Sequence, residues 1–346
     1  MNKIIVIIYS AIHFIVDMAC ALLISCLITP KMGDEIGLFL AILIYNFFAF
    51  AIQLPIGIIA DKVNKNAICS AIGCLIVAVA YAFSNHGIAS CLIAGIGNAM
   101  FHVGGGIDVL NISDKKATLS GIFVSTGAMG LFIGGKAVSI GFDKYYLVIM
   151  ILILSSLSLF WLYQKIKDKI NNEKVIIPEI SQNELIAIAC LIFTVIVRGY
   201  VGLILAFEWK SSFIMALISI FAVVFGKMLG GIIGDQIGYM KISLISLIAS
   251  AFLFIFAFNS SILGILAILF FNMTMPITLT ALSNILFHNK GMAFGLLTVA
   301  LFIGAVPVLF GYESVIFNPA GLCVTTLISA LVLFVGIKKY ERIMEK

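Results

Sequence analysis

The chain has 346 residues, of which 62% are hydrophobic and 11% are charged, and its mean hydropathy is +1.20. Soluble domains carry about 25% charged residues, so this composition excludes a soluble protein and indicates that the lipid bilayer is the solvent for most of the chain. The net charge of +5 comes from scattered lysines and arginines without a clustered basic face, so no nucleic-acid partner is expected.

The sequence contains twelve apolar runs that can cross the hydrocarbon core as helices, although the third and the ninth are short. Helices are expected because lipid cannot satisfy the edges of an open sheet, and because the runs lack the alternation of a membrane β-barrel. The runs span residues 4–28, 37–60, 67–83, 88–110, 117–140, 146–164, 185–207, 211–234, 242–258, 262–282, 291–311 and 319–338. The first run is expected to be an uncleaved membrane helix rather than a signal, since it continues past Cys20 to Ile28.

A hydrophilic segment separates the sixth run from the seventh. The predicted organisation is an N-terminal six-helix bundle over residues 1–164, a cytoplasmic linker over 165–184, and a C-terminal six-helix bundle over 185–346 with a short basic tail. Placing the N-terminus in the cytoplasm leaves only Lys31, Lys144 and Lys210 in the outer loops. The positive-inside rule therefore predicts a multi-pass protein of the plasma membrane with both termini in the cytoplasm.

A short charged turn occurs twice, half a chain length apart. It reads Gly-Ile-Ile-Ala-Asp at 57–61, after the second run, and Gly-Ile-Ile-Gly-Asp at 231–235, after the eighth. Asn98 and Asn272 hold corresponding positions in the fourth and tenth runs, and Leu-Phe-Ile-Gly recurs in the fifth and eleventh. Repeats of six helices with a binding site between them are typical of secondary transporters. The predicted fold is an all-α membrane protein with twelve transmembrane helices in two pseudo-symmetric six-helix bundles.

Residues 57–66, Gly-Ile-Ile-Ala-Asp-Lys-Val-Asn-Lys-Asn, resemble the signature loop of the major facilitator superfamily, Gly-x-x-x-Asp-Arg/Lys-x-Gly-Arg/Lys-Arg/Lys. Asn64 replaces the signature glycine, but asparagine tolerates a positive φ better than most residues. Asn66 replaces a basic residue, which removes one ion-pair partner. The second copy has Gln236 in place of the basic residue. Gating residues implied by this resemblance are Gly57, Asp61, Lys62, Lys65, Gly231, Asp235 and Gly238.

The resemblance also implies where the two turns make contact. The second helix would end against the start of the eleventh helix near Gly291, where the helix N-terminus stabilises the Asp61 carboxylate. Gly57 would let the two helices approach closely. Asp235 would act in the same way near Thr118, at the start of the fifth helix. Lys227, at the repeat position of Gln53 and two turns from Asp235, is predicted to belong to a gating or structural pair.

The first half is also similar to the fosmidomycin-resistance type of exporter. The similar stretches are His-Phe-Ile-Val-Asp at 13–17, Gln-Leu-Pro-Ile-Gly at 53–57 and Gly-Ile-Gly-Asn-Ala-Met-Phe-His at 95–102. After the histidine, that type of exporter continues with Pro-Glu, whereas this chain continues with Val103 and three glycines. The substrate of those exporters is therefore not assigned to this chain.

Residues 130–135 partly match the antiporter motif of the fifth helix, with Leu131 in place of proline. This partial match favours exchange or efflux.

Polar residues inside a membrane are costly and usually functional. His13 and Asp17 lie one turn apart on one face of the first helix, and such a pair can hold and pass a proton near neutral pH. The family resemblance implies that the first and fourth helices line the central cavity, so His102 is predicted to face Asp17. The alternative is a structural hydrogen-bonded group between helices. Asp108, closer to the cytoplasmic end, is interpreted as a loop or gate residue.

Arg198, near the middle of the seventh helix, needs an acidic partner, a cage of carbonyl groups or an anionic substrate. Lys136 is a candidate for the substrate site, or it extends to the interface instead. The predicted substrate-binding residues are Asn46, Asn98, Lys136, Arg198 and Asn272.

The predicted function is secondary active transport by alternating access, with proton-coupled efflux of a small organic molecule or drug. The sequence has no nucleotide-binding loop, so an ion gradient must drive active transport. Proton-coupled uptake of a metabolite is the first alternative, and a non-transporting receptor or scaffold is another. A membrane enzyme with His13, Asp17 and His102 as acid-base groups is a remote alternative, and the chain is not expected to be an enzyme.

The seven cysteines lack metal-ligand or disulfide spacing, so no metal or cofactor is expected. Expected partners are a small-molecule substrate, a proton or other ion and the bilayer, for a protein that acts as a monomer.

Overall fold

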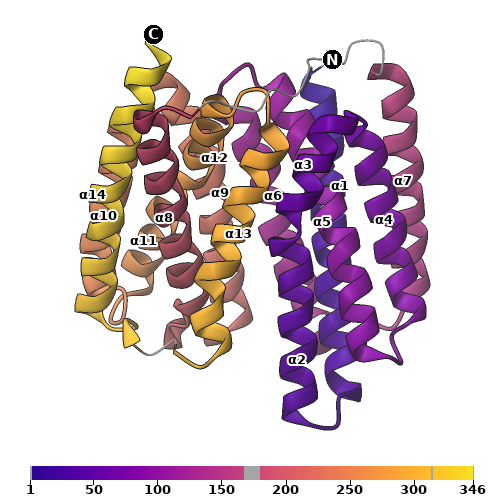
Figure 1. The fold of residues 1–346 in the computed structure, drawn as a ribbon. Helices are drawn as coiled ribbons and strands as arrows, with labels where there is room; N and C mark the ends of the chain where they lie inside the picture. The colour runs from indigo at the N-terminus through magenta and orange to yellow at the C-terminus, as the bar shows by residue number, and fades with distance from the viewer. Residues whose placement is uncertain (1, 167–179, 313–314, 346) are drawn as a thin grey trace. The chain divides into compact units, whose positions relative to one another are not determined.

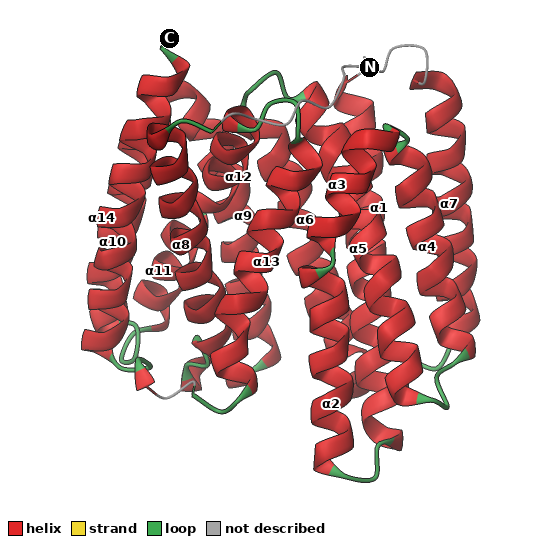
Figure 2. Ribbon diagram, in the orientation of Figure 1, coloured by secondary structure: helices red, strands yellow, loops and turns green. Residues whose placement is uncertain are grey.

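The computed structural model describes residues 2–166, 180–312 and 315–345, so the middle of the predicted linker lies outside the described residues. The described residues form helices and connecting turns without a strand (Figure 2). The α-helices labelled in Figure 1 are α1 (Asn2–Leu22), α2 (Glu35–Asn46), α3 (Gln53–Val63), α4 (Asn66–Ala82), α5 (Gly87–Ile112), α6 (Ala117–Lys136), α7 (Tyr145–Ile166), α8 (Gln182–Ile204), α9 (Phe213–Ile237), α10 (Tyr239–Phe256), α11 (Ser261–Asn272), α12 (Thr274–Ile285), α13 (Lys290–Leu309) and α14 (Pro319–Met344).

These helices combine into the predicted number of membrane crossings. In the described part of the chain, 11 helical segments are long and apolar enough to span a membrane, and α4, with 17 residues, is a shorter apolar helix. Two crossings are interrupted. The segment Glu35–Val63 joins α2 to α3 through a π-helix, Phe47–Ala51, and Ser261–Ile285 joins α11 to α12 at Met273. The prediction of an all-α protein with twelve membrane helices is confirmed.

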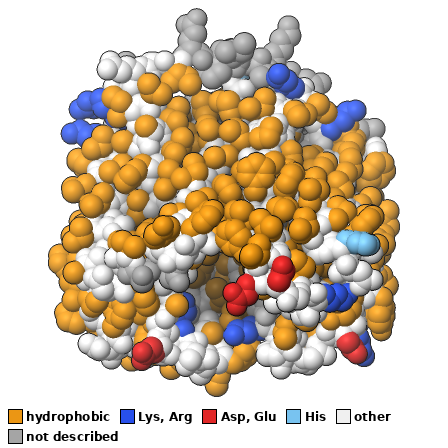
Figure 3. Space-filling model, turned by 60° about the horizontal axis from the view of Figure 1, so that its bottom comes forward, with side chains coloured by type: hydrophobic (Ala, Val, Ile, Leu, Met, Phe, Trp, Pro, Cys, Tyr) orange, Lys and Arg blue, Asp and Glu red, His pale blue; other side chains and the backbone are white. Residues whose placement is uncertain are grey.

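Large apolar side chains cover the outside of the helices. Leu157 on α7 is 60% exposed and Leu331 on α14 is 67% exposed. Figure 3 shows that hydrophobic side chains occupy most of the visible face. A water-soluble protein seldom exposes so much contiguous apolar surface, whereas a lipid-facing one requires it. The chain is therefore an integral, multi-pass membrane protein.

The described chain divides into two compact units. Unit 1 contains residues 2–112, 126–166 and 288–299, and unit 2 contains residues 113–125, 180–287, 300–312 and 315–345. The first half of α13 thus belongs to unit 1, and the first half of α6 belongs to unit 2.

In unit 1, the long helix α5 packs against α1, α2, α3 and α4. Its contacts include polar ones, because Ser70 on α4 donates its hydroxyl hydrogen to the carbonyl of Phe101 on α5. In unit 2, α14 packs against α8 and α10, while α12 contacts both α8 and α9. The interruption between α11 and α12 therefore lies in a segment that α8 and α9 both touch.

Candidate functional site

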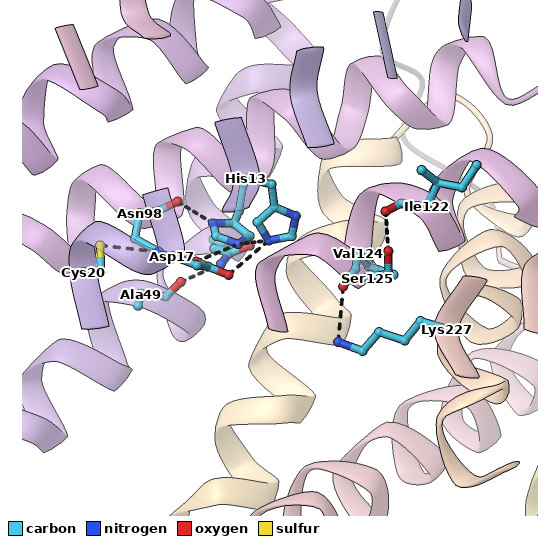
Figure 4. Close-up of polar contacts among 11 residues, drawn as sticks. His13, Asp17, Cys20, Ala49, Asn98, Ile122, Val124, Ser125 and Lys227 are labelled. Carbon is cyan, nitrogen blue, oxygen red and sulfur yellow. Dashed lines mark hydrogen bonds and ion pairs between the residues drawn. The ribbon is translucent and has the colours of Figure 1, made fainter. Parts of the chain in front are cut away.

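The first helix presents a buried histidine and a buried carboxylate side by side. His13 and Asp17 are 5% and 6% exposed, and one turn of α1 separates them. The Nε2 atom of His13 lies 3.2 Å from Oδ2 of Asp17. The same-face arrangement predicted from the sequence spacing is confirmed, and Figure 4 shows the two side chains beside Asn98, which lies on α5.

The fourth membrane helix, α5, supplies two more members of the same cluster. Asn98 donates an amide hydrogen to Oδ1 of Asp17 at 3.0 Å, and its amide nitrogen lies 3.7 Å from Sγ of Cys20. The Nε2 atom of His102 lies 2.8 Å from Nε2 of His13 and 3.5 Å from Oδ1 of Asp17. The predicted proximity of His102 to Asp17 is therefore confirmed. The donor atoms of His13, Asp17 and His102 all lie within 4.8 Å of one another.

Hydrogen bonding fixes the orientation of His102. Its Nδ1 atom lies 2.9 Å from the carbonyl oxygen of Asn98, which can only accept a hydrogen bond. In the hydrogen-bond network, Nδ1 therefore carries a hydrogen, and in the neutral ring Nε2 offers its lone pair toward His13. With both rings neutral and Asp17 ionised, the cluster has one negative charge. One added proton neutralises it.

A glycine on α6 makes room for this cluster. A Cβ atom at Gly127 would overlap Oδ2 of Asp17 and Nε2 of His13. Farther along α6, Gly130 and Gly134 approach the backbone of α1 at Phe14 and Met18 in the same way. Our sequence analysis did not identify Gly127. The only signal for it was its position three residues before Gly130, where the partial antiporter motif begins.

Arg198 occupies a second buried polar site, in unit 2. It lies on α8 and is 8% exposed. Its Nη1 atom donates to Oγ1 of Thr278 on α12 at 3.1 Å. The Thr278 hydroxyl in turn donates to the carbonyl of Met275 at 3.0 Å. Within the described part of unit 2, a single neutral hydroxyl therefore receives the guanidinium, rather than the acidic partner or carbonyl cage that the sequence analysis considered.

The remaining predicted substrate residues do not gather at either site. Asn46 and Asn272 each donate to the carbonyl four residues earlier in their own helix, Ile42 and Ile268, at 2.8 Å. Lys136 is exposed at the last residue of α6. Substrate contact by these three residues stays a prediction.

Asp108 does not lie in a loop, which corrects that part of its interpretation, whereas a role as a gate residue stays a prediction. It lies within α5 and is 4% exposed. It accepts hydrogen bonds from the hydroxyl of Tyr9 on α1 and from Nδ2 of Asn66 on α4, the latter at 2.9 Å. The sequence analysis missed this group because its members come from three different helices.

Comparison with known proteins identifies the fold. No protein-family model and no curated protein sequence matches this chain. Among solved structures, the human organic anion transporter MFSD10 (TETRAN) superposes with a TM-score of 0.68 at 11% identity, over 98% of this chain and 99% of that one. FucP, a major facilitator superfamily transporter in the outward conformation, gives 0.63 at 13% identity over 97% of this chain and 99% of that one. A bacterial homologue of the iron transporter ferroportin gives 0.61 at 13% identity over 99% and 100%.

This chain has the major facilitator fold. The identities of 11–13% show the fold alone, so the substrates named for these transporters are not transferred to this chain. The signature-loop resemblance and the structural match point to the same fold.

The first signature turn of the major facilitator fold caps a helix from the other half of the sequence. Oδ1 and Oδ2 of Asp61 accept hydrogen bonds from the backbone N–H groups of Gly291 and Met292, at 2.7 and 2.9 Å. These donors lie at the start of α13, where the first N–H groups have no partner within the helix and the helix dipole favours a carboxylate. A Cβ atom at Gly57 would overlap the carbonyl of Gly291. The predicted contact is confirmed.

The second turn repeats this arrangement in unit 2. Asp235 accepts from the backbone N–H groups of Ala117 and Thr118, both at 2.8 Å, and from the Thr118 hydroxyl. A Cβ atom at Gly231 would overlap the carbonyl of Ala117. Lys227 does not pair with Asp235. It donates instead to the carbonyl of Val124 at 3.2 Å (Figure 4).

Backbone geometry explains two other features of these turns. Asn64 ends α3 in the left-handed region with a φ of 51°, which agrees with the tolerance expected of asparagine. Gly238 follows α9 with a φ of 98°, which strongly favours glycine. Lys62 and Lys65 are exposed.

Proposed function

We propose that the chain is a secondary active transporter that works by alternating access and exchanges protons for a small organic molecule. The observation that carries the proposal is the buried cluster of His13, Asp17, Asn98 and His102. Buried ionisable groups in membrane helices are expensive to maintain, and they commonly mark proton or substrate pathways.

The cluster is suited to hold one exchangeable proton. Asn98 stabilises the Asp17 carboxylate by donating to it at 3.0 Å. Nε2 of His102, which carries a lone pair, lies 2.8 Å from Nε2 of His13, which then carries the hydrogen of this bond. A proton taken up here is shared among three groups, and the cluster changes from one negative charge to none. A neutral cluster costs less to bury than a charged one, so protonation favours a state in which the cluster is closed off from water.

Efflux by antiport is the direction that we favour. Support comes from the partial antiporter motif, in which Gly130 and Gly134 pack against α1 at Phe14 and Met18. In this proposal, substrate and proton occupy the transporter alternately, and each resets it for the other. The predicted division into bundles 1–164 and 185–346, the cytoplasmic termini, the plasma-membrane location and the monomeric state remain part of the same proposal, as does the fosmidomycin-resistance type.

The two signature turns are proposed to act as gates. Each places a carboxylate on the N–H groups of a helix whose second half belongs to the other compact unit. Breaking such a cap frees the start of the helix, so the paired turns are proposed to favour closure of the cytoplasmic side.

The deciding experiment measures proton movement in sealed vesicles. Inside-out vesicles that contain the protein are energised, and their interior acidification is followed with a pH-sensitive dye while candidate organic compounds are added. Antiport predicts that a transported compound dissipates the pH gradient. Asp17→Asn should abolish the response, whereas Asp143→Asn, at an exposed loop carboxylate, should not.

Other outcomes would replace the proposal. If an imposed gradient drives a compound in the same direction as protons, the transporter is a symporter. Product formed in detergent without any gradient would favour an enzyme. All assays contain a chelator, and a response that needs added Zn²⁺ would assign the cluster to a metal ion instead of a proton.

A further inference from the structure

The membrane-spanning part of unit 2 carries two positively charged side chains in its described interior. Arg198 and Lys227 lie well inside α8 and α9. The acidic residues in the described part of unit 2 all lie in loops or near helix ends: Asp114, Glu184, Glu208, Asp235, Glu341 and Glu345. Asp235, the deepest of them, is already bound by Ala117, Thr118 and Tyr239.

Arg198 uses only a small part of its bonding capacity. A guanidinium has five N–H donors, and in unit 2 one nitrogen of Arg198 is bonded, to the Thr278 hydroxyl. No described carboxylate of unit 2 lies within 4.0 Å of it. The hydroxyl offers no charge, and its own hydrogen is committed to Met275. Among the described residues of unit 2, the remaining donors of Arg198 have no hydrogen-bond acceptor that would offset the cost of burying a cation.

A buried charge without compensation normally destabilises a protein by several kcal/mol. Structural arginines therefore have their donors matched, and an unmatched one indicates a partner that comes and goes. The planar fork of a guanidinium fits the two oxygens of a carboxylate, phosphonate or phosphate, and two parallel charge-assisted bonds to such a group are strong. A neutral or cationic molecule would leave the charge unbalanced.

The position of Arg198 suits a ligand site. Its partner Thr278 follows the interruption at Met273, where α11 gives way to α12. Membrane transporters commonly bind their cargo at such interrupted helices. On the other side, Gly226 and Gly230 bring α9 against the carbonyls of Leu269 and Met273. Lys227 therefore lies on the helix that packs against the interruption, and it adds a second positive charge to this region.

We propose that Arg198 is the anion-binding residue of this transporter and that the transported molecule is a small organic anion with an oxyanion headgroup. This inference rests on the proposed transport function for its physiological meaning. It concerns a different residue from the proton-binding proposal, because Arg198 belongs to unit 2 and the histidine-aspartate cluster belongs to unit 1. Thr278 positions Arg198, and the free part of the guanidinium receives the headgroup.

Ligand binding to the purified full-length protein tests the inference directly. The probes are matched series: benzoate with benzamide, lactate with lactamide, and phenylphosphonate with its neutral diethyl ester. Thermal shift and calorimetry are run on the wild type and on Arg198→Gln, Arg198→Lys and Arg342→Gln. Arg342 is the ideal control, because it is the only other arginine in the chain and is exposed near the end of α14.

The expected result has two parts. At least one anion, and none of the neutral analogues, should bind the wild type and the Arg342→Gln variant. Arg198→Gln should lose this binding, and Arg198→Lys should bind at least about tenfold more weakly, because one compact ammonium replaces the fork. Without ligand, Arg198→Gln should melt at the same temperature as the wild type or higher, since an uncompensated charge has been removed.

Several results would overturn the inference. These are preferential binding of neutral probes, no binding by any anion of the series, or anion affinity that survives in Arg198→Gln. A lower melting temperature of Arg198→Gln without ligand, together with unchanged anion binding by Arg198→Lys, would make the residue structural. Failure of the transport proposal looks different: anions would still bind through Arg198, but no compound would move protons in vesicles.

Discussion

The cap that Asp61 places on α13 allows a quantitative test of the gating proposal. Asp61→Asn keeps the shape of the side chain but removes its charge and one of its two acceptors. The amide nitrogen of asparagine would then face either the N–H of Gly291 or that of Met292, which in the wild type donate hydrogen bonds of 2.7 and 2.9 Å to the carboxylate. One charge-assisted hydrogen bond is lost and the other becomes neutral.

The size of the effect follows from these two bonds. A hydrogen bond to a charged group contributes about 1.5–3 kcal/mol and a neutral one about 1 kcal/mol, and the helix dipole adds about 0.3–1 kcal/mol. Because Asp61 is partly exposed, we discount the sum and expect a net loss of about 2 kcal/mol. This corresponds to an increase of about thirtyfold in the population in which the start of α13 is released.

Hydrogen exchange read by mass spectrometry reports this population directly. The peptide that contains Gly291 and Met292 should exchange about thirtyfold faster in Asp61→Asn, because exchange at these amides requires release of the cap. The peptide that contains Ala117 and Thr118, capped by Asp235, serves as an internal reference.

Asp143→Asn is the matched control, since it removes an exposed carboxylate elsewhere. Equal exchange in Asp61→Asn and the wild type would refute the reasoning. A uniform increase over all helices would show general destabilisation instead of gating.

The other predictions concern the two buried groups of unit 1. Gly127→Ala should abolish proton-coupled transport in vesicles and destabilise the protein by about 1–3 kcal/mol, because the new methyl group overlaps Asp17 and His13. Gly135→Ala, on the same helix with nothing within 4 Å, should leave both properties unchanged, and equal effects of the two variants would contradict the site. Tyr9→Phe should lower the free energy of unfolding by about 1–3 kcal/mol, because it leaves a buried oxygen of Asp108 without its donor. The control is Tyr146→Phe, at a side chain that is 66% exposed, and denaturant titration of the two variants should separate them clearly.

The sequence predicted those features that depend on local spacing or on repetition. Apolar runs identified the membrane helices, and the i, i+4 spacing placed His13 beside Asp17. The contacts of His102 and of Asp61 with distant residues were predictable only through the family resemblance, which supplied the neighbours of each helix. Without it, nothing in the residue spacing connects Asp61 to Gly291.

The missed features share a physical cause. The Tyr9–Asp108–Asn66 group joins side chains from α1, α5 and α4, and a hydrogen bond between separate helices leaves no periodic signal in the sequence. Gly127 contributes by lacking a side chain, so its importance appears only once the atoms around it are placed. Lys227 was expected beside Asp235 from their shared helix, but the N–H groups of Ala117 and Thr118 provide better partners for that carboxylate.

The two units differ in the charge that they hold within the membrane, although the repeated turns indicate a common origin. Unit 1 contains two buried carboxyl groups, Asp17 and Asp108, of which only Asp17 lies beside histidines. The spanning helices of unit 2 contain Arg198 and Lys227 and, in their described interior, no carboxyl group. Each charge is costly when it is alone, and each has a different species that relieves the cost: a proton for the Asp17 cluster and an oxyanion for Arg198. Divergence of the duplicated halves toward opposite charges would thus give one protein a proton-binding group and an anion-binding group, which Asp17→Asn and Arg198→Gln test one at a time.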